Sequence, residues 1–280
     1  FTSIFNPSCV DNNVLFNGNY GISGGSTLSS TSFALIEWDW DFGNSNTYTS
    51  TTDGDANETY SPPMSYNVTL IITDDNNCIS LPKTNTIVVE PLPISSFTST
   101  TECLGITTQL DGSLSSSSTD TWIWKIFDPQ ENGGFTIQTT TTPSHNYTFS
   151  TPGYHTVILS TFSTLSNGQV CVSSPFTQQV YVYDVPQPSF SFNIACEDNL
   201  LDVNEITNFI DQTPSSTVNS VSGLTDALIT LDYVWTFGIN PPINLPPGNS
   251  SYIFGNPNFG IGYTVDLLVT DDNGCQNNFT

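Results

Sequence analysis

The chain has 280 residues, with 26 Asp and Glu but only two Lys and no Arg, so its formal net charge is −24. A surface so poor in cations excludes nucleic acid as a partner and disfavours anionic membranes, because phosphate binding needs Lys and Arg. No stretch approaches the roughly 18 consecutive apolar residues of a membrane-spanning helix, so direct membrane insertion is not expected.

Two strands are predicted in the middle of the first third. In WDWDFG, Trp38, Trp40 and Phe42 alternate with aspartates, which is the period of a strand with one buried face. The segment YNVTLIITDDNNC begins with an alternating run at Tyr66 and ends with turn residues before Cys78. Because both faces of this second run carry apolar residues, we expect it at the centre of its sheet.

The second third shows the same order of features. WIWKIF contains Trp124 at the centre of its alternation, and YHTVILSTFS begins at Tyr154 and precedes Cys171. His155 follows Tyr154 and is predicted to lie on the surface.

The last third repeats the pattern once more. YVWTFG carries Trp235, and YTVDLLVTDDNGC runs from Tyr263 to Cys275. Closing strands are predicted after the second cysteine in the earlier thirds, at 87–89 and 180–182. Only QNNFT follows Cys275, so we expect the closing strand of the last third to be missing.

Three repeats of about 93 residues therefore account for the chain: repeat 1 (1–92), repeat 2 (93–186) and repeat 3 (187–280). Turn-rich stretches separate the strands, and no segment keeps a helical period. The prediction is an all-β protein of three tandem sandwiches, each with about seven strands in two facing sheets. The junctions VVEPLPISSF and VYVYDVPQPSF are short and contain proline, which favours an elongated array.

These motifs resemble the polycystic-kidney-disease (PKD) domain, an immunoglobulin-like sandwich with a W-D-F-G element, an H-x-Y element and a Y-x-V-x-L-x-V-x-D strand. WDWDFG matches the first element, SHNYTFSTPGYHTVIL contains the second, and YTVDLLVTDDNGC matches the third. Repeat 2 departs from the pattern with IFDP in place of Phe-Gly. The resemblance implies core positions at Trp40, Trp124, Trp235, Tyr66, Tyr154 and Tyr263. It also implies a structural role for His145, which belongs to the H-x-Y element. Tandem copies with paired cysteines also resemble the repeat regions of large Bacteroidota surface adhesins, including gliding adhesins.

Each repeat holds two cysteines, here called the first and second cysteine. Six cysteines allow 15 pairings in principle. A repeat that folds alone should pair its own two, which predicts the disulfides Cys9–Cys78, Cys103–Cys171 and Cys196–Cys275. Disulfides imply an oxidising, extracytoplasmic setting at the cell surface or outside the cell.

No catalytic motif is present, so an enzyme is not expected and no cofactor is required. Calcium is the one candidate ligand, because carboxylates cluster where few cations compete. The candidate ligands are Asp74, Asp75, Asp271, Asp272, Asp39 and Asp41. The same Asp- and Asn-rich segments are also typical of turns, so the alternative that these residues only form turns stays open.

Two functions remain. The chain is expected to be a non-enzymatic structural or adhesive segment of a long extracellular filament, in which sandwiches act as a stiff stalk. Its partners are then neighbouring repeats and other copies of itself in a fibre. The alternative is a set of accessory modules that anchor a secreted hydrolase to its substrate.

Overall fold

The computed structural model describes residues 1–4, 6–18, 35–131, 133–194, 206–214, 231–238, 240–245, 248, 250–253 and 264–280. Every regular element in these ranges is a β-strand. None of the described residues belongs to a helix long and apolar enough to cross a membrane. Cys196 and Tyr263, both named above, lie outside the described residues.

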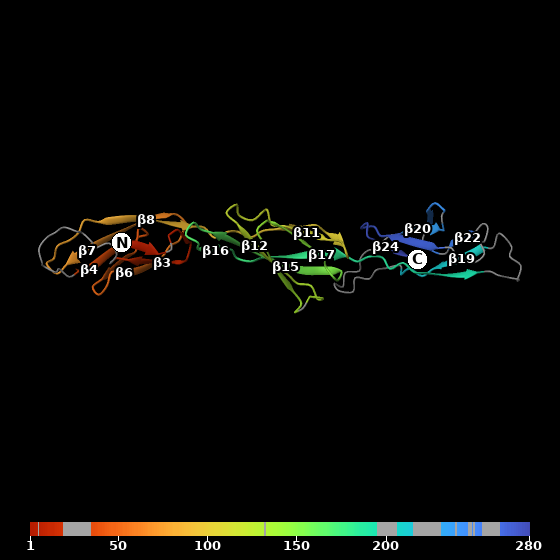
Figure 1. Cartoon of the computed structure of the whole chain (residues 1–280), viewed down its shortest axis with the longest axis horizontal. Coiled ribbons are helices and arrows are strands. Elements are labelled where there is room, and N and C mark those ends of the chain that lie inside the picture. The colour runs from red at the N-terminus through yellow and green to blue at the C-terminus, as the bar shows by residue number, and fades with distance from the viewer. Residues whose placement is uncertain are drawn as a thin grey trace.

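The molecule is an elongated row of three β-sandwiches (Figure 1). Each sandwich has a hydrophobic cluster of its own, formed in repeat 1 around Trp40, in repeat 2 around Trp124 and in repeat 3 around Trp235. The all-β class and the tandem sandwiches are therefore confirmed.

Repeat 1 packs a three-stranded sheet against a five-stranded one. The smaller sheet has the order β1 (Thr2–Ile4), β3 (Asn13–Asn17), β6 (Asp55–Thr59). The larger has the order β2 (Ser8–Cys9), β8 (Lys83–Glu90), β7 (Ser65–Asp74), β4 (Leu35–Asp41), β5 (Thr47–Ser50). The sheets meet where Phe16 of β3 lies against Trp40 of β4, with ring centroids 5.5 Å apart.

Repeat 2 uses the same plan, with a longer central strand of 12 residues against 10 in repeat 1. One sheet has the order β14 (Ser144–Tyr147), β11 (Thr108–Asp111), β9 (Thr98–Ser99). The other has the order β10 (Glu102–Cys103), β17 (Phe176–Tyr183), β15 (Gly153–Thr164), β12 (Thr121–Ile126), β13 (Thr136–Thr140). In addition, β16 (Val170–Val172) pairs with the end of β15.

Repeat 3 also has two described sheets. One has the order β18 (Phe190–Ile194), β19 (Ile206–Asp211), β22 (Ser250–Ile253). The other has the order β21 (Ile243–Leu245), β20 (Asp232–Phe237), β23 (Val265–Thr270), β24 (Gln276–Phe279). Phe209 of β19 lies against Trp235 of β20, with ring centroids 5.6 Å apart, as Phe16 lies against Trp40 in repeat 1.

The tryptophan strands β4, β12 and β20 behave as their alternation predicts. Their inner-face residues are all buried: Trp38 and Trp40; Trp122, Trp124 and Ile126; Tyr233, Trp235 and Phe237. Phe42, which directly follows β4, is buried as well. In repeat 1 the intervening Asp41 is exposed. Period-two patterning therefore located one face of each sandwich core correctly.

The predicted register of β15 is wrong by one residue. Tyr154 is 55% exposed, whereas His155 is only 4% exposed. Strand pairing shows why: Trp40 faces Leu70 across β4 and β7, and Trp124 faces Leu159 across β12 and β15. His155 precedes Leu159 by four residues, as Tyr66 precedes Leu70. A slip of one residue exchanges the two faces of a strand, so His155 takes the core position that Tyr154 was expected to hold.

The expectation that no strand forms after Cys275 is also wrong. The four residues of β24 pair with Leu267–Thr270 of β23. Its position matches the start of β8, because Leu267 faces Phe279 as Leu70 faces Lys83. A closing strand is therefore begun in repeat 3, although β8 and β17 run for eight residues and β24 for four.

Candidate functional site

In repeats 1 and 2 the first cysteine lies at the end where the chain leaves that repeat. Cys9 ends β2, which pairs in parallel with the end of β8, so that Cys9 lies opposite Glu90. Cys103 ends β10 in the same way and lies opposite Tyr183 at the end of β17. After β8 and β17 the chain passes to the next repeat. Cys9 and Cys103 are thus placed at the downstream ends of their sandwiches.

The second cysteine of repeat 1 lies at the opposite, upstream end, in the turn that follows β7. The Oδ1 atom of Asp74 accepts hydrogen bonds from the N–H groups of Asn76 at 2.9 Å and Cys78 at 2.8 Å. The N–H of Asp74 donates to the carbonyl of Cys78 at 3.1 Å. Asn77 has a φ of 61°, in the left-handed region that Asn tolerates. The motif DDNNC therefore builds a turn that holds the backbone of its cysteine.

The turn of repeat 3 is built from the same bonds. The Oδ1 atom of Asp271 accepts from the N–H groups of Asn273 at 2.9 Å and Cys275 at 2.8 Å. The N–H of Asp271 donates to the carbonyl of Cys275 at 3.0 Å. Gly274 supplies the positive φ, 83°. The repeated motifs DDNNC and DDNGC thus form turns that hold the backbone of the second cysteine.

These positions separate the two cysteines of one repeat. The ten residues of β7 span about 30 Å at the usual rise of a strand. Cys9 lies near the Ser65 end of β7, because Ser65 faces Val88 and Ser8 faces Val89. Cys78 follows the other end. A disulfide requires Cα atoms within about 7 Å, so the predicted bond Cys9–Cys78 is sterically excluded.

The disulfides join neighbouring repeats instead. Cys9 bonds Cys171, and Cys103 bonds Cys275, each with a Cα–Cα distance of 5.6 Å. The predicted pairs Cys103–Cys171 and Cys196–Cys275 are therefore wrong as well. In both bonds the first cysteine of one repeat pairs with the second cysteine of the following repeat. The bonds overlap along the chain, since Cys103 lies between Cys9 and Cys171.

Figure 1 shows the same arrangement at the level of strands: β16 lies at the end of repeat 2 that faces repeat 1, and β24 at the end of repeat 3 that faces repeat 2. Hydrogen bonds support both junctions. The side-chain amide of Asn167, in the hairpin before β16, donates to the carbonyl of Pro7 at 2.7 Å. That of Asn277 in β24 donates to the carbonyl of Pro186 at 3.0 Å. Sequence reasoning singled out neither asparagine.

The linker between repeats 1 and 2 is itself held in place. Pro93 is buried, and the N–H of Ile94 donates to the hydroxyl of Ser116 at 2.7 Å. The hydroxyl of Ser95 is buried and lies within hydrogen-bonding distance of Thr161 (3.1 Å) and Ser173 (2.5 Å). The linker is therefore packed onto repeat 2 and does not hang free.

Cys78 differs from the other described cysteines. Cys9, Cys171 and Cys275 are buried in their disulfides, whereas Cys78 is a free thiol and is exposed. Its turn is nevertheless built like the turn that holds Cys275.

The candidate calcium ligands are not brought together. Leu35 at the start of β4 faces Asp74, while Asp41 at the other end of β4 faces Thr69, so the aspartates of β4 and of the turn lie apart. Asp39 accepts a bond from Thr49, and Asp41 from the N–H of Gly43. Within the described ranges, no three His, Cys, Asp or Glu side chains gather as a metal site would require.

A polar network ties the IFDP segment of repeat 2 to its core. Asp128 is buried, and its carboxylate accepts from the N–H of Ser150 at 2.8 Å and from the Ser150 hydroxyl. Tyr147 donates to Glu131 at 2.8 Å and lies 3.2 Å from Asp128. Burial alone would raise the pKa of Asp128, but the bonds from Ser150 and from the N–H of Gln130 hold this pKa below its usual value. Burial and the two carboxylates raise the pKa of Tyr147.

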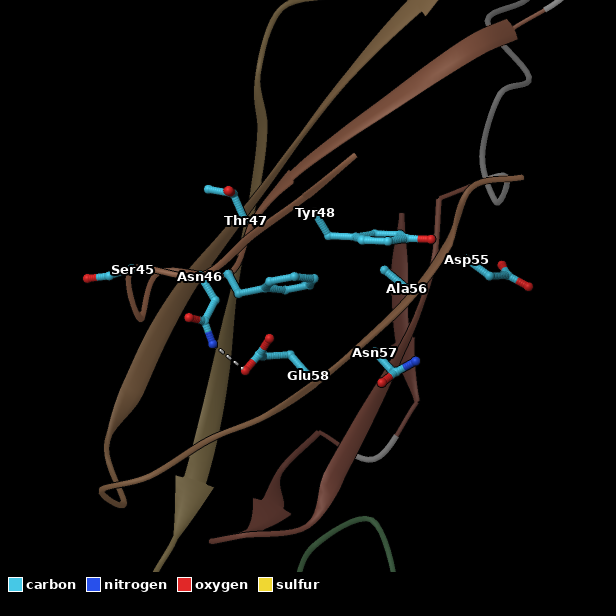
Figure 2. A pocket seen from close by; sticks show the side chains of 9 residues that line it. Ser45, Asn46, Thr47, Tyr48, Asp55, Ala56, Asn57 and Glu58 are labelled. Atoms are coloured by element: carbon cyan, nitrogen blue, oxygen red, sulfur yellow. Dashed lines mark hydrogen bonds between the residues drawn. The ribbon is translucent and has the colours of Figure 1, made fainter. Parts of the chain in front are cut away.

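Repeat 1 carries an open hollow of about 470 Å³ beside β5 and β6. Figure 2 shows Tyr48 and Ala56 on one side of it and the Asn46–Glu58 pair on another. The amide of Asn46 donates to Glu58 Oε1 at 2.9 Å, and that of Asn44 donates to the same atom at 3.1 Å. One carboxylate oxygen of Glu58 thus accepts two hydrogen bonds from the neighbouring loop. Nothing in the sequence pattern marked these residues.

His145 lies in β14, as its predicted structural role requires, and its ring stacks on Trp124 with centroids 6.1 Å apart. Burial lowers its pKa. His155 reaches two carbonyl oxygens, those of Thr151 at 2.8 Å and Phe127 at 3.2 Å. Both histidines are therefore parts of the core of repeat 2.

No protein-family model and no curated protein matches the chain. Among solved structures, it is similar to fibronectin(III)-like modules of CbhA from Clostridium thermocellum, with 10% identity, a TM-score of 0.32, and coverage of 62% of this chain and 86% of that chain. It is also similar to a structure of carbohydrate-binding modules from the β-sandwich superfamily, described as promiscuous in specificity. That similarity has 16% identity, a TM-score of 0.28, and coverage of 100% of this chain and 81% of that chain. Similarities this low do not indicate what the chain binds.

Proposed function

We propose that the chain is a non-enzymatic, PKD-like repeat segment of an extracellular surface filament or adhesin, in which it acts as a stiff, disulfide-braced stalk. One observation carries this proposal: each of the two junctions is crossed twice, by the linker peptide and by a disulfide. Two separate covalent connections between the same two sandwiches restrict their bending and twisting far more than one flexible linker does.

The chemistry of the chain agrees with this role. Disulfides persist in oxidising compartments, which supports a location outside the cytoplasm. A net charge of −24 keeps the surfaces of neighbouring filaments apart and favours solubility. The buried polar groups described above bond to backbone atoms and to one another within repeat 2, as structural groups do.

The disulfides also stabilise the array against unfolding. Their sequence separations are 162 and 172 residues. In the chain-entropy model each closed loop of this size contributes about 5 kcal/mol relative to the reduced unfolded chain, before the overlap of the loops is considered.

The proposal is tested by small-angle X-ray scattering of the oxidised and reduced 280-residue chain. The oxidised monomer should scatter as a rod of one length. Reduction should broaden the distribution of interatomic distances, because each junction keeps only its linker. Cys78→Ser is the control, since it removes the free thiol and leaves both disulfides. Identical scattering before and after reduction would contradict a bracing role.

The adhesin and the hydrolase-anchoring alternatives differ in the rest of the polypeptide. Many further repeats in the same gene favour the filament. A single catalytic domain beside a few repeats favours an accessory module.

A further inference from the structure

We propose that Cys78 is one half of a third inter-repeat disulfide, whose other half is the first cysteine of another repeat of this kind docked at the upstream end of repeat 1. The proposal rests on the stalk function and extends it. Repeat 1 then offers a covalent attachment point for a further repeat, which is joined by the same kind of disulfide that joins repeats 1, 2 and 3.

The two existing junctions carry the argument. The second cysteines of repeats 2 and 3, Cys171 and Cys275, each bond the first cysteine of the repeat before them. Cys78 is the second cysteine of repeat 1 and occupies the same place, after the central strand of the larger sheet. In all three repeats this place is the upstream end of the sandwich.

The local structure around Cys78 is already that of a bonded cysteine. In both turns an aspartate Oδ1 accepts the N–H of the cysteine at 2.8 Å, from Asp74 in repeat 1 and from Asp271 in repeat 3. The backbone of Cys78 is therefore held as that of Cys275 is held. The difference lies in the environment: Cys275 is 1% exposed, whereas Cys78 is exposed.

The surface beside Cys78 also suits a docked repeat. Ile79 is 72% exposed and Leu81 is 89% exposed. Large exposed apolar side chains beside an exposed free thiol indicate a surface that is covered in the assembled state. The downstream end of a repeat fits this surface, because its first cysteine ends a two-residue edge strand parallel to the closing strand, as in Cys9 and Cys103.

The bond forms by thiol–disulfide exchange with a small oxidised disulfide such as glutathione disulfide. The Cys78 thiolate attacks one sulfur of the oxidant, which releases one glutathione thiol and leaves a mixed disulfide on Cys78. The thiolate of the docked cysteine then attacks the Cys78 sulfur and releases the second glutathione thiol. Two protein thiols are thereby oxidised and one glutathione disulfide is reduced to two thiols.

For the isolated 280-residue chain, the docking repeat is repeat 3 of a second copy, whose first cysteine by sequence is Cys196. Cys196 itself lies outside the described residues. Repeat 2 stands between repeats 1 and 3 in the row (Figure 1), so a bond between Cys78 and the first cysteine of repeat 3 joins two different copies. Such contacts are head-to-tail and do not close, so they produce linear oligomers.

The experiment incubates the concentrated chain in a glutathione redox buffer and resolves the products on a non-reducing gel. We expect a ladder of covalent oligomers and, by peptide mapping, a Cys78–Cys196 bond. Cys78→Ser alone and Cys196→Ser alone should each stay monomeric. An equimolar mixture of the two variants should give dimers and nothing larger, since it holds one reactive end of each kind.

Two results would overturn the proposal. One is a symmetric Cys78–Cys78 dimer of the Cys196→Ser variant. The other is a mixture that stays monomeric while Cys78 remains open to alkylation. Neither result would contradict the stalk function. X-ray scattering of the monomeric Cys78→Ser variant tests the disulfides Cys9–Cys171 and Cys103–Cys275 independently.

Discussion

His155 fills in repeat 2 the position that Tyr66 fills in repeat 1. Its ring lies 4.3 Å from that of Phe149, as Tyr66 lies 4.6 Å from Tyr60. The polar tips also correspond: His155 Nε2 lies 2.8 Å from the carbonyl four residues earlier, and the Tyr66 hydroxyl donates to the carbonyl of Pro62 at 2.6 Å. Two different side chains therefore satisfy one structural requirement, an inward ring with a polar end.

Adjacent substitutions in β15 test this register. His155→Ala removes a buried ring and its hydrogen bond, so it should destabilise repeat 2 by about 2–3 kcal/mol. Tyr154→Ala, its matched control, removes an exposed ring that packs on Tyr181 and should change stability by less than about 1 kcal/mol. Amide exchange of β15, followed by mass spectrometry, measures both. A larger effect at position 154 than at 155 would contradict the register.

Asp128 gives repeat 2 a pH-dependent contribution to stability. Its pKa in the folded chain is below its usual value, so the folded state favours the charged form. This contribution is fully present above the unfolded pKa of about 3.9 and is lost as pH falls through the lower folded value. Asp128→Asn should cost about 1–2 kcal/mol at neutral pH. Denaturant titrations at several pH values should show the difference from wild type shrinking below pH of about 4; a gap that stays constant would contradict the charge-based explanation.

Calcium binding by the acidic turns stays a hypothesis from the sequence. It predicts a higher melting temperature in millimolar calcium than in excess EDTA at matched ionic strength, because a ligand bound only by the folded state stabilises it. Equal melting temperatures would leave Asp74 and Asp271 with their turn bonds as their sole role.

At the scale of elements, the direction of the strands decides how the repeats are joined. The strand that carries the first cysteine, β2 in repeat 1 and β10 in repeat 2, runs parallel to the last strand of its repeat, so both strands end downstream. The central strand runs antiparallel to the last one and delivers the second cysteine upstream. Each of these sandwiches thus presents a cysteine position at either end.

The turn after the central strand should control one disulfide. Asp271→Ala removes the acceptor for two N–H groups, one of them that of Cys275. We expect a loss of about 1–3 kcal/mol in repeat 3 and easier reduction of Cys103–Cys275, measured by alkylation of Cys275 at graded reductant concentrations. Asp74→Ala is the matched control, because its turn holds the free Cys78; it should leave the reduction of both disulfides unchanged. Equal reducibility in the two variants would contradict this role of the turn.

At the scale of the whole molecule, the overlapping disulfides limit how far the chain can be stretched. When both ends are pulled, tension follows the shortest covalent path, which uses residues 1–9, the segment 103–171 and residues 275–280. That path has about 80 residues and extends to roughly 290 Å, whereas all 280 residues of the reduced chain extend to roughly 1,000 Å. Most of the chain is thus shielded from tension.

Single-molecule stretching of the oxidised and reduced chain measures this limit. The fully unfolded oxidised chain should reach less than about a third of the reduced contour length. A common contour length in both conditions would show that the disulfides do not lie in the path of the force.

The sequence by itself determined the all-β class, the threefold repeat and the buried tryptophans. Each follows from the local alternation of apolar and polar residues and from sequence motifs that recur along the chain. It also identified the aspartate turns, although it left open whether these residues only form turns or also bind a metal. Which cysteines pair was decided only by the tertiary structure, because pairing depends on which end of a sandwich each cysteine reaches and on how the sandwiches are stacked. The exchange of Tyr154 for His155 has a related cause: a one-residue shift leaves the alternating pattern readable but reverses its faces, and only the pairing with β12 and β17 settles which face meets the core.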